Sequence, residues 1–565
     1  MAAAVAAAAL LGIPVTAAQP ISLTPPAAIG AAPMPAQNPN DGNQIQVAPL
    51  QPVDASWSGP LSQAKGGLPR DMWNGTSRRF VAATLPQLQP VVSPELDSLA
   101  RRLLLSDAIA PVAPPATGTA NAPAGSALLS ARIDRIYALG FVADGLALID
   151  SLPADAATEA IDRDRVELRF AANDGAGACR DVSDRIAHYA GPWWARALIA
   201  CQALAGDFAE ASLGQSLLID QRAPPDPEFD ALIRALSERR PIRIARLGDP
   251  TPLRLALLAA AKHPLPVEAL AVADPAALAG YAGNQAVPPD GRLAAAERAE
   301  ALGALPPEAL AALYGTITLK PEELARARRA TRPPTDAHER ALLYALATSG
   351  TDLAARMIAI EALMADAERR SVFVPMARVV APILADIPSV NADPKFAAMA
   401  ARILLAAGST AAAQPWVIAS QDKAVLLLSR VALPGVPQID AGLARNAAAA
   451  AGNAAASPRA DLLYSLLVAL GDDPATLDDL TPSALTAPLV PGALPNAALW
   501  DAQQRAAQNG RLGETVLATL LLAASGGHLT PEPLLLGRAV SGLRAVGLDS
   551  DAHALALEAA IDAGI

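Results

Sequence analysis

Alanine supplies much of the apolar content of this chain, and this constrains the possible folds more than any other feature. Hydrophobic residues make up 52 % of the 565 residues, yet aromatic residues make up only 3 %. Alanine is the strongest helix former, but its methyl group buries little apolar surface. A core built from alanine has to be thin and repetitive, with helices that approach one another closely. The composition therefore favours a stack of helices over a compact α/β enzyme.

Proline and glycine mark the ends of the expected helices. Proline at the first helical position loses no hydrogen bond, and a following acidic residue suits the positive end of the helix dipole. This pattern occurs as "SPEL" at 93, "DPEF" at 226, "PPEAL" at 306, "KPEEL" at 320, "TPSAL" at 481 and "TPEP" at 530. Glycine, which commonly ends a helix, interrupts apolar runs at positions 140, 206, 350, 408, 471 and 510. Clear strand alternation is absent, so the sequence predicts an all-α protein.

Two of these glycine turns carry a family resemblance. The stretches "GDFAEA", Gly206 to Ala211, and "GRLGETVL", Gly510 to Leu517, resemble the turn and second-helix start of the tetratricopeptide repeat. The resemblance implies an α-solenoid, a superhelix of antiparallel helical hairpins whose concave face binds other proteins. The turn glycines do not recur at that family's period of about 34 residues, and Ala and Leu fill most of its aromatic positions. We therefore expect an irregular, divergent α-solenoid.

Composition also predicts how the chain is divided. An apolar run, a leader rich in Pro, Asn and Gln, and a second linker rich in Pro, Ala and Gly separate the helical parts. The expected parts are a signal peptide at 1–18, a disordered leader at 19–56, a short N-terminal helical unit at 57–108, a linker at 109–125 and the α-solenoid at 126–565, with sub-boundaries near 222–250 and 430–457.

The N-terminal run indicates export. Small residues end it in a pattern that suits signal peptidase cleavage after Ala17 or Ala18. We therefore expect a periplasmic or secreted protein with no integral membrane segment in the mature chain. The alternative is a retained N-terminal membrane anchor facing the periplasm. Alanine is only weakly hydrophobic and Pro14 interrupts the run, which favours cleavage over anchoring.

The only two cysteines, Cys179 and Cys201, lie on either side of a Gly191–Pro192 turn. At about 1.5 Å per helical residue, both lie roughly 15–18 Å from that turn. Two antiparallel helices would therefore bring them level, and a disulfide would fit an oxidising compartment. Two free buried thiols are the alternative. A redox or metal site is disfavoured, because the chain has no C-x-x-C and only His188 lies nearby as a further ligand.

Other residues that could carry chemistry are interpreted as structural. Trp193 and Trp194 could stack on a sugar, but a tryptophan pair at a helix start more often packs in a core. Asp162 and Asp164 alternate with arginines, which predicts a salt-linked helix face. The arginine pairs are expected at solvated helix ends; they occur at 78–79, 101–102, 239–240, 328–329 and 369–370. No residue is assigned to catalysis, a metal or a cofactor.

The net charge is −11, and no basic stripe with interleaved aromatic residues appears, so nucleic acid is not an expected partner. We expect a non-enzymatic exported helical-repeat scaffold that binds a protein partner in the cell envelope. The alternative is a cell-wall-acting enzyme. The chain is similar in overall character to the helical superhelix of soluble lytic transglycosylases. The catalytic "ES" step and the "GLMQ"-like segment of those enzymes are not found in it.

Overall fold

A computed structural model describes residues 54–112, 124–238, 244, 246–318, 320–327, 332–350, 352–433, 453–477, 496–530 and 532–565. They fall within one compact unit, Asp54–Ile565. The predicted signal peptide and residues 19–53 of the predicted leader lie outside the described residues, as do most of the predicted linker and much of the region near 430–457. The described part begins inside the predicted leader, where Ser56 is already buried.

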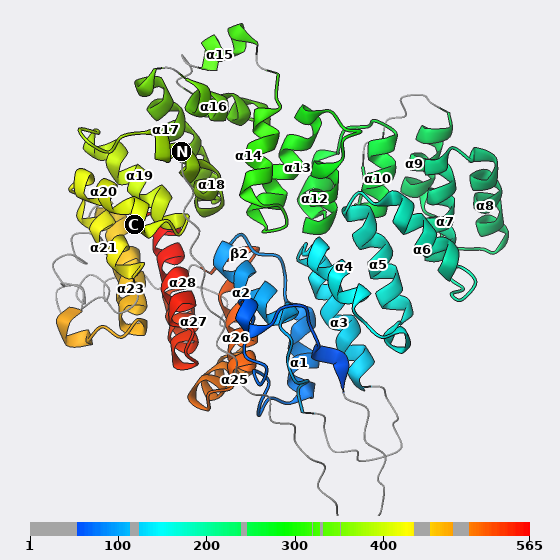
Figure 1. Cartoon of the computed structure of the whole chain (residues 1–565), viewed down its shortest axis with the longest axis horizontal. Coiled ribbons are helices and arrows are strands. Elements are labelled where there is room, and N and C mark those ends of the chain that lie inside the picture. The colour runs from blue at the N-terminus through cyan, green and yellow to red at the C-terminus, as the bar shows by residue number, and fades with distance from the viewer. Residues whose placement is uncertain are drawn as a thin grey trace, which may run out of the picture. The chain divides into compact units, whose positions relative to one another are not determined.

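Within the described residues the protein is helical, with 26 α-helices and a single two-stranded hairpin. The prediction of an all-α protein is confirmed (Figure 1). Helices that follow one another in sequence pack together through most of the chain, for example α3 on α4, α19 on α20 and α27 on α28. These three pairs are Ala124–Ala138 with Val142–Asp150, Pro394–Ala406 with Thr410–Ser420, and Pro533–Ala545 with Asp549–Asp562.

The remaining elements have the following bounds. In the first half they are η1 Ala55–Trp57, η2 Gln63–Lys65, α1 Arg78–Thr84, η3 Leu85–Gln87, α2 Pro94–Leu105, η4 Ala154–Ala156, α5 Glu159–Ala171, α6 Gly175–Arg185, α7 Pro192–Ala205, α8 Phe208–Asp220, α9 Pro227–Ser237, α10 Pro252–Ala260, α11 Val267–Val272 and α12 Pro275–Gly283. In the second half they are α13 Pro289–Ala301, α14 Pro307–Gly315, α15 Pro321–Ala327, α16 Ala337–Ser349, α17 Leu353–Arg369, α18 Phe373–Val380, η5 Ala381–Asp386, α21 Lys423–Val431, α23 Asn453–Ala469, η6 Pro474–Leu477, α25 Ala497–Gln508, α26 Leu512–Leu522, β1 Ala524–Ser525 and β2 His528–Leu529.

The proline signals place most of the predicted helix starts correctly. Helices α2, α9, α14 and α15 each begin at the proline of the predicted motif. The Ser93 hydroxyl caps α2 by accepting from the backbone N–H of Leu96 at 3.1 Å, and Asp226 caps α9 in the same way. Helix α27 begins at Pro533, two residues later than the first proline of "TPEP". The "TPSAL" motif lies outside the described residues.

Five of the six predicted turn glycines adopt the left-handed conformation that ends a helix. Their φ angles are positive at positions 140, 206, 408, 471 and 510. Gly350 differs, because α16 ends there with an extended residue at φ −65°. Glycine and alanine also let helices approach closely. A Cβ built on Gly280 of α12 would lie 2.8 Å from the backbone of Ala171 in α5, a distance too short for any side chain.

The N-terminal segment lies between parts of the chain that are far apart in sequence. Helix α2 packs on α3, α26 and α28, and Figure 1 shows it in blue between the cyan and the orange-red helices. Arg132 of α3, which is fully buried, bonds to backbone carbonyl groups of α2 and of the segment before it. The Arg132 guanidinium donates to the oxygens of Leu104 at 2.6 Å and Ser58 at 2.8 Å. The hydrophobic core runs continuously from Trp57 to Ile565.

Candidate functional site

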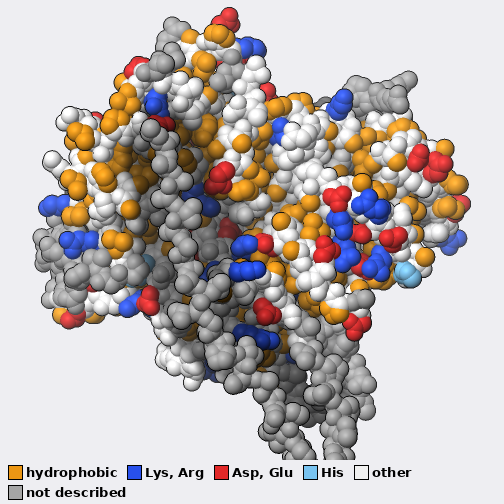
Figure 2. Space-filling view, in the orientation of Figure 1, with side chains coloured by type: hydrophobic (Ala, Val, Ile, Leu, Met, Phe, Trp, Pro, Cys, Tyr) orange, Lys and Arg blue, Asp and Glu red, His pale blue; other side chains and the backbone are white. Residues whose placement is uncertain are grey.

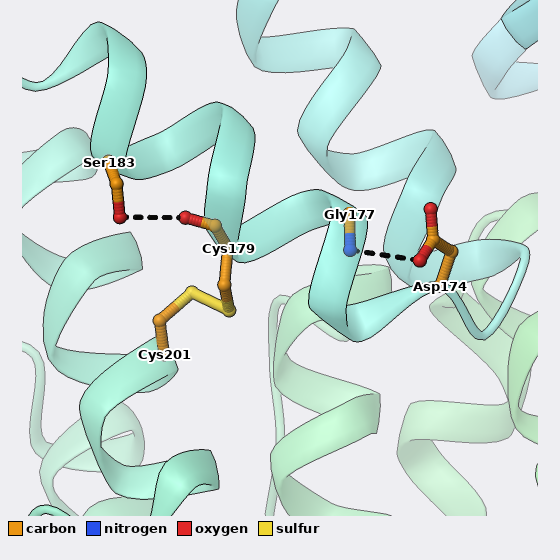
Figure 3. The surroundings of a disulfide bond; sticks show 5 residues. All are labelled: Asp174, Gly177, Cys179, Ser183 and Cys201. Atoms are coloured by element: carbon orange, nitrogen blue, oxygen red, sulfur yellow. Dashed lines mark hydrogen bonds between the residues drawn. A yellow bond between two sulfur atoms is a disulfide. The ribbon is translucent and has the colours of Figure 1, made fainter.

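The two cysteines form a disulfide between adjacent antiparallel helices. Cys179 lies on α6 and Cys201 on α7, and their Cα atoms are 5.5 Å apart (Figure 3). Helix α6 is capped by Asp174, whose carboxylate accepts from the backbone N–H of Gly177 at 2.9 Å. The bonded pair predicted from the sequence is therefore present. Among the described residues, no three His, Cys, Asp or Glu side chains are grouped so that they could hold a metal ion.

The tryptophan pair beside this hairpin packs as expected. Trp194 is buried, stacks on Tyr189 with 5.1 Å between ring centroids, and donates from Nε1 to Glu159 at 3.1 Å. The Trp193 ring packs edge-to-face against the Trp194 ring. The Arg163 guanidinium lies over the Trp193 ring, 5.0 Å from the ring centroid. One ring is in the core and the other lies at its margin, so the pair is part of the hairpin's packing.

The charged residues near the hairpin form a network. Arg169 pairs with Asp181 at 2.6 Å and with Asp174 at 2.8 Å. Asp162 is buried, accepts a hydrogen bond from the Tyr189 hydroxyl at 2.8 Å and pairs with Arg185 at 3.2 Å. Figure 2 shows acidic and basic side chains intermingled over the region of α4 to α6. The predicted salt link is present for Asp162, which makes it from inside the protein to Arg185 of α6, whereas Asp164 has no ion-pair partner among the described residues.

One arginine of each described pair is less exposed than expected. Arg78 is buried and pairs with Asp54, and Arg102 pairs with Asp551 of α28. Arg369 and Arg370 both bind the buried carboxylate of Asp366, at 2.7 and 2.9 Å. The expectation of a solvated helix end is wrong for Arg78, which is buried against Asp54 and the Pro111 carbonyl. Arg102 and Arg370 are half-buried, whereas Arg79, Arg101 and Arg369 are exposed as expected. The pairs at 239–240 and 328–329 lie outside the described residues.

The disulfide lines a largely apolar cavity of about 420 Å³. Phe170, Leu204 and alanines of α7 and α10 form its apolar wall. Asn173 and Asn284 also line it, but both amide groups are engaged with neighbouring backbone, at 3.0 and 2.9 Å.

A larger cavity, of about 600 Å³, lies between α14, η5, α19 and α20. It combines a hydrophobic floor with two charged side chains of opposite sign. The floor includes Leu384, Ile387, Leu404 and Trp416, and the charged residues are Glu308 and Arg378. Tryptophan and arginine are the residue types most enriched where one protein anchors another. A second cavity of similar size, about 620 Å³, lies between α17, α27 and α28 and is lined by Arg459, Asp562 and His528 among others.

Exposed apolar side chains lie next to the residues that line the α14–α20 cavity. Val390, which follows the lining residue Ser389, is 76 % exposed, and Ile418 of α20 is 75 % exposed. Figure 2 shows hydrophobic side chains at the surface over α19 and α20. Sequence reasoning did not single out this cavity, because its walls come from four elements and none of them carries a motif. The one unusual local feature in the sequence of its walls is the Pro415–Trp416 pair, which lies inside helix α20.

Comparison with known protein families, with curated proteins and with solved structures finds no match to this chain. Among the described residues, no helix combines the length and the apolar character needed to cross a bilayer.

Proposed function

We propose that this protein is a non-enzymatic, exported helical scaffold that binds a protein partner in the cell envelope through the α14–α20 cavity. The observation that carries the proposal is the combination, in one open cavity, of an apolar floor with Trp416 and the opposite charges of Glu308 and Arg378. Protein interfaces have an apolar centre with aromatic and arginine anchors and a polar rim. The occupant that fits is a side chain of a partner protein, with the exposed Val390 and Ile418 extending the contact.

The proposed architecture is an irregular α-solenoid of the kind suggested by the tetratricopeptide-like turns. Its support is the order of packing, since most helices from α3 to α28 contact the helix that follows them. The proposed location outside the cytoplasm is supported by the Cys179–Cys201 bond, because disulfides persist in oxidising compartments. The apolar run at 1–18 supplies the expected export signal.

A pair of neighbouring alanines provides the test. Ala411 and Ala412 are both exposed in the first turn of α20, but only Ala412 lines the cavity. A photo-reactive amino acid is placed at either position, and the full-length protein is cross-linked in cells of its native host. We expect a discrete cross-linked species from position 412, found in the envelope fraction. Position 411 should give less of it. Ala412→Arg should abolish capture of the same partner and Ala411→Arg should retain it.

Each part of the proposal has an outcome that contradicts it. Equal cross-linking from both positions would remove the cavity as the binding site. Full-length protein with an intact Met1 in the cytoplasmic fraction would contradict export. The enzyme alternative is tested separately by incubating purified protein with peptidoglycan, where release of soluble muropeptides would show that the scaffold assignment is wrong.

A further inference from the structure

A backbone N–H in the first turn of helix α2 bonds to a side chain 463 positions away in sequence. Glu558 of α28 accepts a hydrogen bond from the backbone N–H of Glu95 at 3.1 Å through Oε2. Ser93 is fully buried and itself caps Leu96. The first N–H groups of a helix have no partner within the helix. The start of α2 is therefore completed by a carboxyl group of α28, which is 5 % exposed.

Several further carboxyl groups converge on this contact. Glu95 and Asp97 lie in the first turn of α2, and Glu300 of α13 faces Asp97. One oxygen on each of Glu95, Asp97, Glu300 and Glu558 is buried without a hydrogen-bond partner. Gly303, in the turn after α13, leaves no room for a Cβ beside Asp97. The carboxyl groups thus lie where α2 meets both α28 and the α13–α14 turn.

The positive charges around this contact are fewer than the acidic groups. Arg378 of α18 is the cation that faces Asp97, Glu300 and Glu558, while Arg102 faces Glu95 but pairs with Asp551. Helices α3 and α26 also pack on α2. Their charged groups have other partners: Arg132 of α3 bonds to backbone carbonyls, and Glu514 of α26 pairs with Arg511. Four further acidic groups face the cluster. Asp551 faces Glu95, Asp562 faces Glu558, and Glu297 and Glu308 face Glu300. Arg402 in turn faces Asp562.

We propose that the contact of α2 with α28 and the α13–α14 turn is a pH-sensitive clasp, which holds while Glu95, Asp97, Glu300 and Glu558 are largely protonated and loosens when they ionise. A protonated carboxyl group can still accept the Glu95 N–H bond through its carbonyl oxygen. Ionisation would instead place several like charges in a buried space with one facing arginine, and burying unpaired charge is costly.

The titration of these groups sets the direction of the effect. Burial raises the pKa of Glu558 to about 8 and that of Glu300 to about 7, and it raises the pKa values of Glu95 and Asp97 well above their usual range. The folded form is fully favoured below the ordinary carboxyl pKa of about 4.5. That contribution is lost progressively as the pH rises above about 4.5, and it is fully lost above about 7 to 8. The clasp is therefore tight in acid and weak in mild alkali.

Amide hydrogen exchange of the full chain tests the clasp. Protection factors, corrected for the intrinsic pH dependence of exchange, are measured between pH 5.5 and 8.5 over α2 and α28, with α9 as internal reference. We expect protection of α2 and α28 to fall at least about tenfold over this range, which is the effect of one pKa unit, while α9 changes little. In Glu558→Gln the amide oxygen can still accept the Glu95 N–H bond but cannot ionise, so the fall should be smaller. Glu322→Gln, at an exposed position of α15, should behave as wild type.

The wild-type protein alone can overturn the proposal. Protection of α2 and α28 that does not depend on pH, or that falls in step with α9, would show that the contact does not titrate. If Glu558→Gln does not fold, Asp97→Asn takes its place. A pH dependence that neither substitution reduces would assign the titration to other groups and overturn the clasp as stated.

Discussion

At the scale of single residues, Arg340 shows how this protein holds charge inside a helical stack. Its guanidinium donates to both oxygens of Glu297, at 2.8 and 2.6 Å, and the Tyr314 hydroxyl donates to the same carboxylate at 2.7 Å. Arg340 and Glu297 are 8 % and 7 % exposed. The pair joins α13 to α16 and satisfies groups that would otherwise be buried without a partner.

Arg340→Ala should therefore destabilise the fold by about 3–5 kcal/mol, because it leaves the Glu297 carboxylate buried without its main partner. The matched control is Arg505→Ala on α25. Arg505 pairs with Asp501 at 2.8 Å, but both side chains are about 60 % exposed, so its loss should cost about 0–1 kcal/mol. Urea unfolding of the two variants compares the costs. Equal losses would mean that the Arg340–Glu297 pair is hydrated and contributes no more than a surface pair.

Buried charged groups are also what sequence reasoning missed. Arg102 looks like an ordinary helix-end residue, and Glu558 looks like one acid in an alanine-rich helix. Each meets a partner hundreds of residues away in sequence, Asp551 for Arg102 and the start of α2 for Glu558. Periodicity within a helix identifies its apolar face, but it cannot identify which distant element covers a polar one.

At the scale of secondary-structure elements, local signals were sufficient. Proline at the first turn, side-chain caps and glycine in the left-handed conformation act within a few residues, so the motifs at 93, 226, 306 and 320 located their helices. The disulfide could be predicted for a similar reason, because the break in the helical pattern between the two cysteines places them on neighbouring helices. Helix α6 ends at Arg185, before the predicted Gly191–Pro192 turn, and Pro192 is the first residue of α7. The α14–α20 cavity could not be predicted, since it depends on how four separate elements meet.

The α6–α7 disulfide should stabilise its own hairpin. Closing a loop of 22 residues contributes roughly 3 kcal/mol in the chain-entropy model. Cys201→Ser should lower the melting temperature and speed amide exchange over 156–220, while 500–565 remains largely unchanged. Thiol labelling of the denatured, unreduced wild type should find no free thiol, and reduction should release two. Stoichiometric labelling before reduction would contradict the bond, and equal loosening at 500–565 would show that the two regions unfold as one.

At the scale of the whole molecule, α2 couples regions that a linear stack of hairpins would keep independent. In such a stack each unit contacts only its neighbours. Helix α2 instead packs on α3, α26 and α28, and six of its twelve residues are buried. A substitution that destabilises α2 should therefore also destabilise α3 and α28, which are more than 400 residues apart in sequence.

Leu103→Ala tests this coupling. Leu103 is fully buried in α2, so truncating it should cost about 2–5 kcal/mol through lost contacts and a residual cavity. We expect faster amide exchange in α3 as well as in α26 and α28, in contrast to the local effect expected for Cys201→Ser. Exchange that quickens in α2 alone would show that its contacts contribute little to the stability of the helices around it.

The bond between Glu558 and the start of α2 also constrains how the protein is made. A ribosome adds about 5–20 residues per second, so roughly 25 to 90 s separate the synthesis of Glu95 from that of Glu558. During that interval Ser93 can cap α2, but the Glu95 N–H lacks its bond to Glu558 and the face of α2 that packs on α28 is uncovered. The nascent segment is therefore exposed to aggregation and proteolysis for much of translation. A chaperone that shields it until α28 emerges would be expected to raise the yield of folded protein more than one acting on the hairpins of α6 to α8, whose main packing partners lie within α5 to α10 and are made much sooner.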